Sequence, residues 1–223
     1  MSALPERRIR AVVFDLDGTL VRYQGVEFES SWGAIAAAAG VREASGRLLE
    51  EYLPRPDAYA EWVEKDAALL AGVPVARVME RIFPPPYAKG VREGIRGLRG
   101  RYALGILSSG VDLVADAVRD DLGLDFSLAN HLEVEDGRFT GRCELRVDLW
   151  GKDRAMQALA REQGLRLEEV CFVGDYLNDV PVMRLVGLAV ALNPKDVALE
   201  EEADFVTRDV AEIPAFLERA ARG

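Results

Sequence analysis

Four short runs of consecutive apolar residues punctuate the chain, and each run ends in polar residues. They cover residues 11–14, 103–107, 170–173 and 188–191. A nearly continuous apolar run, as opposed to an alternating one, is typical of a strand that is covered on both faces. The four runs therefore predict buried strands of a parallel sheet.

Helical patterns lie between these runs. In the segment 111–123, apolar residues recur three and four positions apart, and Gly123 stands where the helix would end. The segment 153–164 repeats this pattern and ends at Gly164. Strands that alternate with helices predict an α/β fold with a doubly wound parallel sheet.

Residues 22–88 break this rhythm. They show no convincing strand pattern and contain alanine-rich helical stretches between proline-rich breaks. We predict a small helical cap domain of residues 22–88, inserted after the first strand of a core domain formed by residues 1–21 and 89–223. Three aromatic residues of the cap occur at helical spacings and are expected to pack in its core: Trp32, Tyr59 and Trp62.

One further segment has a different pattern. In "EVEDGRFTGRCEL", residues 133–145, the dipeptide Asp136-Gly137 separates two short stretches of alternating polar and apolar residues. An Asp-Gly pair between such stretches is typical of a tight turn that joins antiparallel strands. We therefore predict a β-hairpin in this segment.

Composition and charge narrow the function classes. With 223 residues and a hydrophobic fraction of 49%, the chain can bury a substantial core. Its net charge of −10 argues against binding to the phosphate backbone of nucleic acids, which needs basic patches. No apolar run reaches the roughly 18 residues that span a bilayer, and no secretory leader precedes the first strand. We expect a cytoplasmic protein without nucleic-acid or membrane partners. A homodimer is compatible with the sequence, which leaves the oligomeric state open.

Two carboxylates follow the first apolar run. In "VVFDLDGTLV", Asp15 and Asp17 are two positions apart, so on an extended chain both point to the same side. Ligands of parallel α/β sheets bind beyond the carboxyl ends of the strands. Paired carboxylates are costly there unless a cation joins them, and Mg²⁺ takes such oxygen ligands. Gly18 would allow a sharp turn and Thr19 would offer a hydroxyl, while simple turn capping is the alternative.

The other strand ends also carry polar residues. The run at 103–107 leads into Ser108, Ser109 and Gly110 before a predicted helix, and such helix N-termini bind phosphate or are merely capped. Lys152 stands just before another helix, where its ammonium group could hold a phosphate oxygen and a carboxylate or be solvated.

The run at 170–173 repeats the design of the first. Asp175 follows the strand and could supply a further metal oxygen, and Asn178 and Asp179 come next. Asp179, four residues after Asp175, could orient Lys152 or a metal-bound water without contacting the metal itself. Each of these signals is weak alone, but their order along the chain is specific.

That order resembles the haloacid dehalogenase superfamily. "DLDGT", a strand ending in Ser108, then Lys152, then "GDYLND" match its four motifs in sequence. The match covers the whole chain outside the insertion, and the helical cap after the first motif is also similar. Within the superfamily, the segment 108–143 and the spacing from Lys152 to Asp175 are most similar to the phosphoserine phosphatase-like branch.

The resemblance implies a role for each matching residue. Asp15 matches the nucleophile that takes up the phosphoryl group, and Asp17 matches the general acid that later acts as base. Ser108 and Lys152 match the residues that bind phosphate, and we add Thr19, Ser109 and Asn178 to that set. The implied Mg²⁺ ligands are Asp15, the backbone carbonyl of Asp17, and Asp175, with Asp179 in support.

The implied function is a Mg²⁺-dependent phosphatase that hydrolyses a small phosphorylated metabolite through an aspartyl-phosphate. A phosphomutase or phosphotransferase of the same superfamily would use the same acidic pair, and a non-catalytic binding module would keep only the fold. Gln24 stands near the place where the branch has a glutamate that reads the substrate ammonium group. We therefore expect phosphoserine to be a poor substrate, or to be read through Glu27 or Glu29.

Overall fold

A computed structural model describes residues 8–222, so residues 1–7 and 223 of the predicted core domain lie outside the described part. The four predicted strands are confirmed, and three of them extend beyond the apolar run. The described residues form one sheet of seven strands: β1 (Ala11–Phe14), β2 (Ala103–Val111), β3 (Phe126–Glu135), β4 (Arg138–Glu144), β5 (Val170–Gly174), β6 (Leu188–Leu192) and β7 (Phe205–Thr207).

The strand order confirms the doubly wound topology. It is β4-β3-β2-β1-β5-β6-β7, with every neighbouring pair parallel except β3 and β4. The chain winds outward from β1 in one direction through β2 and β3, and from β5 in the other direction through β6 and β7. The crevice at such a topological switch point, beyond the carboxyl ends of β1 and β5, is where ligands bind in open α/β sheets.

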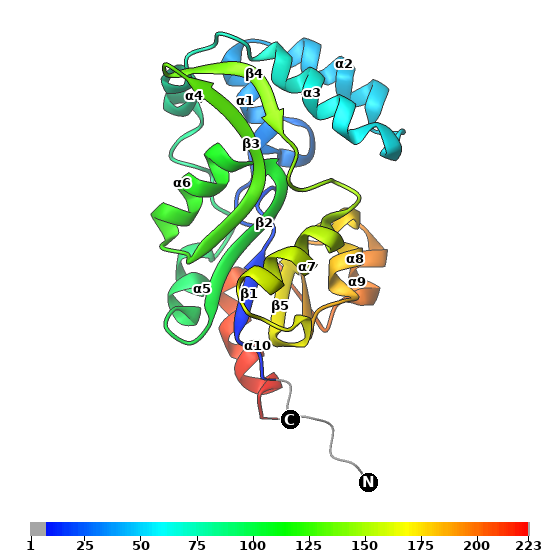
Figure 1. Cartoon of the computed structure of the whole chain (residues 1–223). Helices are drawn as coiled ribbons and strands as arrows, with labels where there is room; N and C mark the ends of the chain where they lie inside the picture. The colour runs from blue at the N-terminus through cyan, green and yellow to red at the C-terminus, as the bar shows by residue number, and fades with distance from the viewer. Residues whose placement is uncertain (1–7, 223) are drawn as a thin grey trace.

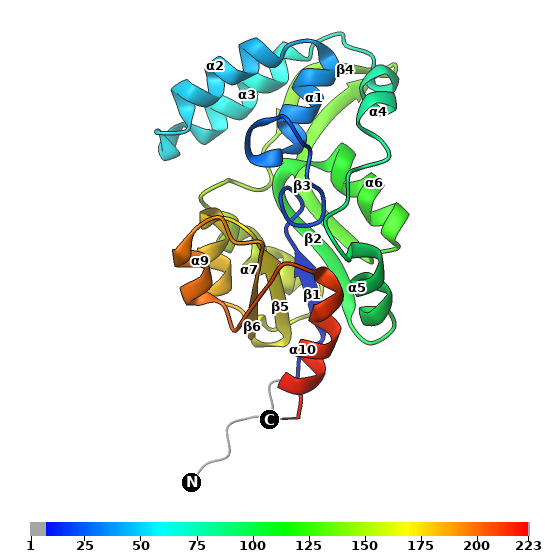
Figure 2. The ribbon, with the colours of Figure 1, turned by 180° about the vertical axis from the view of Figure 1, so that it is seen from behind.

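Helices cover both faces of the sheet (Figures 1 and 2). Because side chains alternate along a strand, Val12 and Phe14 of β1 belong to one apolar cluster and Val13 belongs to another. The described helices are α1 (Ser31–Ala39), α2 (Arg42–Tyr52), α3 (Tyr59–Leu69), α4 (Val75–Ile82), α5 (Val91–Leu98), α6 (Asp112–Leu122), α7 (Lys152–Glu162), α8 (Val180–Met183), α9 (Val197–Glu202) and α10 (Ile213–Ala220). Helices α5, α6 and α10 pack in the first cluster, whereas α7, α8 and α9 pack in the second.

The inserted segment is helical, as predicted. Helices α1 to α4 lie between β1 and α5 in the chain and form a layer beyond the carboxyl ends of the strands (Figure 1). The two connections to the core lie side by side, since the Arg22 amide donates to the Pro86 carbonyl at 2.9 Å and the Ala88 amide to that of Leu20 at 2.9 Å. This pairing supports an insertion between residues 22 and 88, although the division into two domains stays a prediction.

The predicted hairpin is confirmed and has a role that the sequence did not indicate. Asp136 and Gly137, with φ of 48° and 73°, form its turn. Its tip reaches the inserted helices, because the Gly72 amide donates to the Phe139 carbonyl at 2.8 Å and the Val75 amide to that of Gly137 at 2.9 Å. The hairpin therefore braces the helical layer over the sheet. Among the described residues, no helix is long and apolar enough to cross a membrane.

Candidate active site

Asp15 and Asp175 meet at the switch point of the sheet. They directly follow β1 and β5, which pair with Phe14 opposite Val173. Both side chains are buried, and a carboxylate oxygen from each lies within 4.8 Å of the other and of one from Asp179. Three carboxylates in one buried cluster repel one another, so the site requires positive charge.

Lys152 supplies part of that charge. Its side chain is fully buried at the start of α7, and Nζ lies 3.1 Å from Asp15 Oδ1 and 2.6 Å from Asp179 Oδ1. Burial alone would lower the pKa of Lys152, but the charges of Asp15 and Asp179 outweigh it and raise that pKa, so the ammonium form persists. The other oxygen of Asp179 accepts the Asp175 backbone amide at 3.0 Å. The predicted contact between Lys152 and Asp179 is thus present.

The acidic cluster fits a small divalent cation. Asp15 Oδ1 and Asp175 Oδ2 are buried, and each faces one lysine ammonium group, that of Lys152 at 3.1 Å and that of Lys195 at 2.7 Å. A carboxylate oxygen has more than one lone pair, so both oxygens can also bind a metal ion. Burial, followed by the charge of Asp15, raises the pKa of Asp175 to about 7. Thr19 was expected to contact phosphate, but its hydroxyl donates to Asp175 Oδ1 at 3.1 Å and so orients that carboxylate instead.

Glycine is required between the two acidic motifs. Gly18 has a φ of +83°, and a Cβ atom there would lie 2.2 Å from Asp175 Oδ2. The backbone after Asp17 can therefore approach the acidic cluster closely only without a side chain. This explains why the acidic pair is followed at once by glycine.

Asp17 faces away from the cluster, toward the first inserted helix. The Ser31 amide donates to its Oδ1 at 2.8 Å and the Ser31 hydroxyl donates to its Oδ2 at 2.7 Å. Burial raises the pKa of Asp17 to about 7, which outweighs the lowering effect of Ser31. The carboxylate cluster thus contains Asp179 in place of the Asp17 side chain, and the predicted metal contact through the Asp17 backbone carbonyl stays a prediction.

Gly110 keeps Asp17 in this position. A Cβ atom on Gly110 would lie 2.6 Å from both Asp17 Oδ2 and Ser31 Oγ. We expect Gly110→Ala to lower kcat by about tenfold or more, because a small displacement of a reacting group costs that much, with little change in melting temperature. The control is Gly46→Ala in α2, a second glycine that lines the cleft but where a Cβ atom meets nothing within 4 Å. Equal kcat values for the two variants would contradict the prediction.

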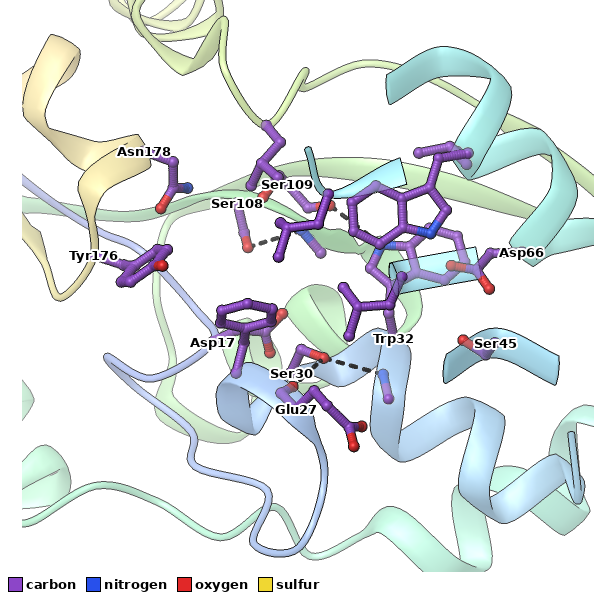
Figure 3. A pocket seen from close by; sticks show the side chains of 18 of the residues that line it. Asp17, Glu27, Ser30, Trp32, Ser45, Asp66, Ser108, Ser109, Tyr176 and Asn178 are labelled. Carbon is purple, nitrogen blue, oxygen red and sulfur yellow. Dashed lines mark hydrogen bonds between the residues drawn. The ribbon is translucent and has the colours of Figure 1, made fainter. Parts of the chain in front are cut away.

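The predicted phosphate-binding residues surround the same space. Ser108 is buried and its hydroxyl accepts the Gly110 amide at 3.0 Å. Ser109 and Asn178 line the cleft with it, from β2 and from the short 3-10 helix Leu177–Asp179 before α8 (Figure 3). The carbonyl of Ser109 accepts three bonds, from Trp32 Nε1 at 3.3 Å, Tyr59 Oη at 3.1 Å and Asn130 Nδ2 at 2.8 Å. The end of β2 is thereby tied to the inserted helices and to the hairpin.

A cleft of about 1100 Å³, its solvent-open part included, lies between the acidic cluster and helices α1 to α3. That volume accommodates a small metabolite. Tyr59 is buried and Trp32 packs against the core, as expected, but Trp32, Tyr59 and Trp62 all line the cleft as well. The same helical spacing is expected of residues that pack in the core and of residues that line a cleft. Only the packing of α1 and α3 decides which face of each helix is turned toward the cleft.

The expected importance of Gln24 is not supported by its position. Gln24 is exposed, does not line the cleft, and donates to Glu29 Oε1 at 2.9 Å. Glu29 itself is occupied by Arg22, with nitrogen to oxygen distances of 2.9 and 3.0 Å. Glu27 does line the cleft. A count of positions from the first motif pointed to Gln24. The chain after β1 runs further than that count assumes, so the acidic residue that lines the cleft is the later Glu27.

Three residues of the site were missed in the sequence. Ser31 holds Asp17, Asp66 lines the far wall of the cleft, and Lys195 places its Nζ 2.7 Å from Asp175 Oδ2. Each lies in a segment without a recognisable motif. For Ser31, the pair Ser30-Ser31 ahead of an alanine-rich helix was a usable hint, because helix N-termini accept carboxylates.

The fold and the site together define a doubly wound α/β protein with a buried lysine and an acidic cluster at the switch point of its sheet, covered by inserted helices. A family model of the haloacid dehalogenase-like hydrolases matches residues 12–184, and the chain belongs to that family. The resemblance predicted from the four motifs is therefore confirmed.

Several known relatives are phosphoserine phosphatases. The one from Methanocaldococcus jannaschii is 30% identical over 216 residues, which cover 95% of this chain and 99% of the relative. The one from Archaeoglobus fulgidus is 35% identical over 201 residues, which cover 89% of this chain and only 56% of the relative. The chain thus spans the full length of some curated relatives and about half the length of others.

A solved structure described as a phospho-aspartyl intermediate analogue of phosphoserine phosphatase has the same fold. It superposes with a TM-score of 0.75 at 30% identity, over 94% of this chain and 99% of that chain. A substrate-bound phosphoserine phosphatase complex superposes with the same TM-score of 0.75 at 29% identity. Both likenesses cover the inserted helices as well as the sheet, because they extend over nearly the whole chain.

Proposed function

We propose that this protein is a Mg²⁺-dependent phosphatase that hydrolyses a small phosphomonoester through an aspartyl-phosphate on Asp15. The observation that carries the proposal is the position of Asp15, which is buried at the end of β1, lines the cleft, and lies 3.1 Å from Lys152 Nζ. The phosphoserine phosphatases among the relatives, and the intermediate analogue of one of them, support the same chemistry.

The residues present divide the reaction between them. A carboxylate oxygen of Asp15 attacks phosphorus as the bond to the leaving oxygen breaks. The ammonium group of Lys152 and donors near Ser108 stabilise the charge on the equatorial phosphoryl oxygens. Asp17, with its pKa raised to about 7 by burial, protonates the leaving oxygen and then takes a proton from the water that releases phosphate from Asp15.

We assign the metal site to Asp15, Asp175 and the backbone carbonyl of Asp17. Two observations support it: the buried oxygens Asp15 Oδ1 and Asp175 Oδ2, whose negative charge is only partly balanced by Lys152 and Lys195, and the closeness of the carboxylates to one another. A Mg²⁺ ion bound there supplies positive charge to the transferring phosphoryl group. Asp179 is engaged by Lys152 and a backbone amide, so it supports the site from behind.

Metal removal is expected to abolish turnover. Treatment with EDTA should remove activity and Mg²⁺ should restore it, whereas Ca²⁺ should not, because its larger and looser coordination shell misplaces the nucleophile. Independently of activity, Mg²⁺ should raise the melting temperature of the parent protein and of Asp57→Asn, an exposed residue outside the cleft. Mg²⁺ should raise the melting temperature of Asp175→Asn much less, because that variant lacks one of the assigned metal ligands. Full activity of a metal-free preparation would refute the metal site.

The activity itself is tested with p-nitrophenyl phosphate and Mg²⁺. A hydrolase releases nitrophenol and inorganic phosphate in equal amounts. A phosphotransferase or phosphomutase would release less phosphate than nitrophenol when an alcohol acceptor is present, and a binding module would release neither.

The substrate we propose is a small phosphorylated metabolite in a reducing compartment such as the cytoplasm. The two cysteines, Cys143 and Cys171, are free, as is usual for proteins of that compartment. Phosphoserine is the substrate named for the relatives, but Gln24, which we expected to weaken its recognition, lies outside the cleft. The cleft walls must therefore decide the substrate.

A further inference from the structure

One end of the cleft is formed by a single face of α3. Tyr59, Trp62, Val63 and Asp66 occur three and four positions apart, so they share that face, and all four line the cleft. Ser45 of α2 lies next to Asp66, and Figure 3 shows both on the side of the cleft away from Tyr176 and Asn178. A substrate bound with its phosphate near Ser108 can direct its alcohol portion toward this end.

The wall between the two ends is aromatic and well fixed. Trp32 and Tyr59 both donate to the Ser109 carbonyl, so their rings are held against the end of β2. Tyr59 and Trp62 pack edge to face with centroids 5.8 Å apart. Such a wall favours an apolar stem, and aromatic faces also attract cations that pass over them.

Asp66 is an unbalanced acid at the end of this wall. Only 8% of the residue is exposed, and its Oδ1 atom is buried without a hydrogen-bond partner. Within residues 8–222, no lysine, arginine or histidine nitrogen forms an ion pair with it. Burial raises the pKa of Asp66 to about 6, although hydrogen bonds from Ser45 and Trp62 act to lower it. Neutral hydrogen-bond donors do not balance a buried carboxylate charge, so the site favours a ligand that brings a positive charge.

The cations that line the cleft are engaged elsewhere. Arg42 Nη2 lies 3.8 Å from Glu27 Oε1, and Lys195 Nζ lies 2.7 Å from Asp175 Oδ2. Both basic residues among the described lining residues thus already face an acid, and neither forms an ion pair with Asp66. The charge at that end selects for a cation and against a second anion.

We propose that the preferred substrate is the phosphomonoester of an amino alcohol without a carboxylate, whose ammonium group pairs with Asp66 and whose stem lies along Trp32, Tyr59 and Trp62. This inference rests on the proposed phosphatase function and specifies its substrate. Phosphoserine fits less well, because its carboxylate would meet the acidic end of the cleft without a cation to receive it.

The test is a series of ω-aminoalkyl phosphates of increasing length, each paired with the n-alkyl phosphate of the same length. At the best length we expect kcat/KM for the amine to exceed that for its neutral partner by about tenfold or more, and to exceed that for phosphoserine. In Asp66→Asn this ratio should fall toward one, while Asp57→Asn, which removes the same charge from an exposed site outside the cleft, should keep it. Each ratio is taken within one variant, so a loss of folded protein does not affect it.

A ratio at or below one for the parent protein at every length, or an unchanged ratio in Asp66→Asn, would overturn the inference while phosphatase activity stands. If no ester is hydrolysed, the proposed function fails instead, and binding decides the inference. Titration calorimetry with ω-aminoalkyl phosphonates and n-alkyl phosphonates needs no turnover. A tighter Kd for the amine that is lost in Asp66→Asn supports the inference, and equal Kd values overturn it.

Discussion

Replacement of Asp15 by asparagine is expected to abolish phosphatase turnover, with kcat lowered by a factor of about 10³ or more. The neutral amide cannot attack phosphorus, and Asp15 is the only acid of the cluster that both lies next to Lys152 and faces the cleft, within the part of the chain that the structure describes. Asparagine has nearly the same volume, so the packing around β1 should survive. Measurement of kcat with p-nitrophenyl phosphate and Mg²⁺ checks the result.

Two further readouts separate loss of the nucleophile from loss of the fold. The variant weakens the pairing of Lys152, which keeps Asp179 at 2.6 Å, and relieves repulsion among three neighbouring negative charges, so its melting temperature without metal should stay close to that of the parent protein. Mass spectrometry after acid quenching should find a phosphoryl group on the peptide that contains Asp15 in the parent protein and in Asp57→Asn, but not in Asp15→Asn. Activity within tenfold of the parent would exclude Asp15 as the nucleophile.

The sheet and the acidic motifs could be predicted because both depend on local patterns. A strand buried on both faces appears as an apolar run, and the residues that follow it lie at the edge of the sheet where ligands bind. Asp15, Ser108 and Asp175, which the strand ends and the order of the four motifs together brought to one site, line the same cleft. The edge strand β7 was missed because Phe205–Thr207 has three residues of mixed burial and no continuous apolar run.

The substrate side of the site could not be predicted in the same way. Its residues come from helices whose exposed and buried faces are fixed only by packing across the chain. Tyr59 illustrates this, because it is at once a core residue, a donor to Ser109 and a wall of the cleft. Counting positions from the first motif led to Gln24, whereas the loop and the short helix Glu27–Glu29 carry the chain past that point before it reaches the cleft.

The most diagnostic result is expected from Asp17→Asn. If Asp17 acts first as acid and then as base, its loss should lower kcat for alkyl phosphates by about 10²- to 10⁴-fold. The two steps respond differently to the leaving group. Nitrophenolate departs without a proton, so Asp17→Asn should still transfer the phosphoryl group from p-nitrophenyl phosphate to Asp15.

Hydrolysis of the aspartyl-phosphate then lacks its base and becomes slow. Stopped-flow absorbance should therefore show a burst of about one nitrophenolate per active site in Asp17→Asn, followed by slow turnover, whereas an alkyl phosphate should give no burst of alcohol. Ser31→Ala is the matched control, because it removes one bond to Asp17 and keeps the carboxyl group and the backbone bond. It should turn over p-nitrophenyl phosphate repeatedly without a trapped intermediate. Equal losses for alkyl and aryl substrates in Asp17→Asn, with no burst, would show that Asp17 only positions its neighbours and moves no proton.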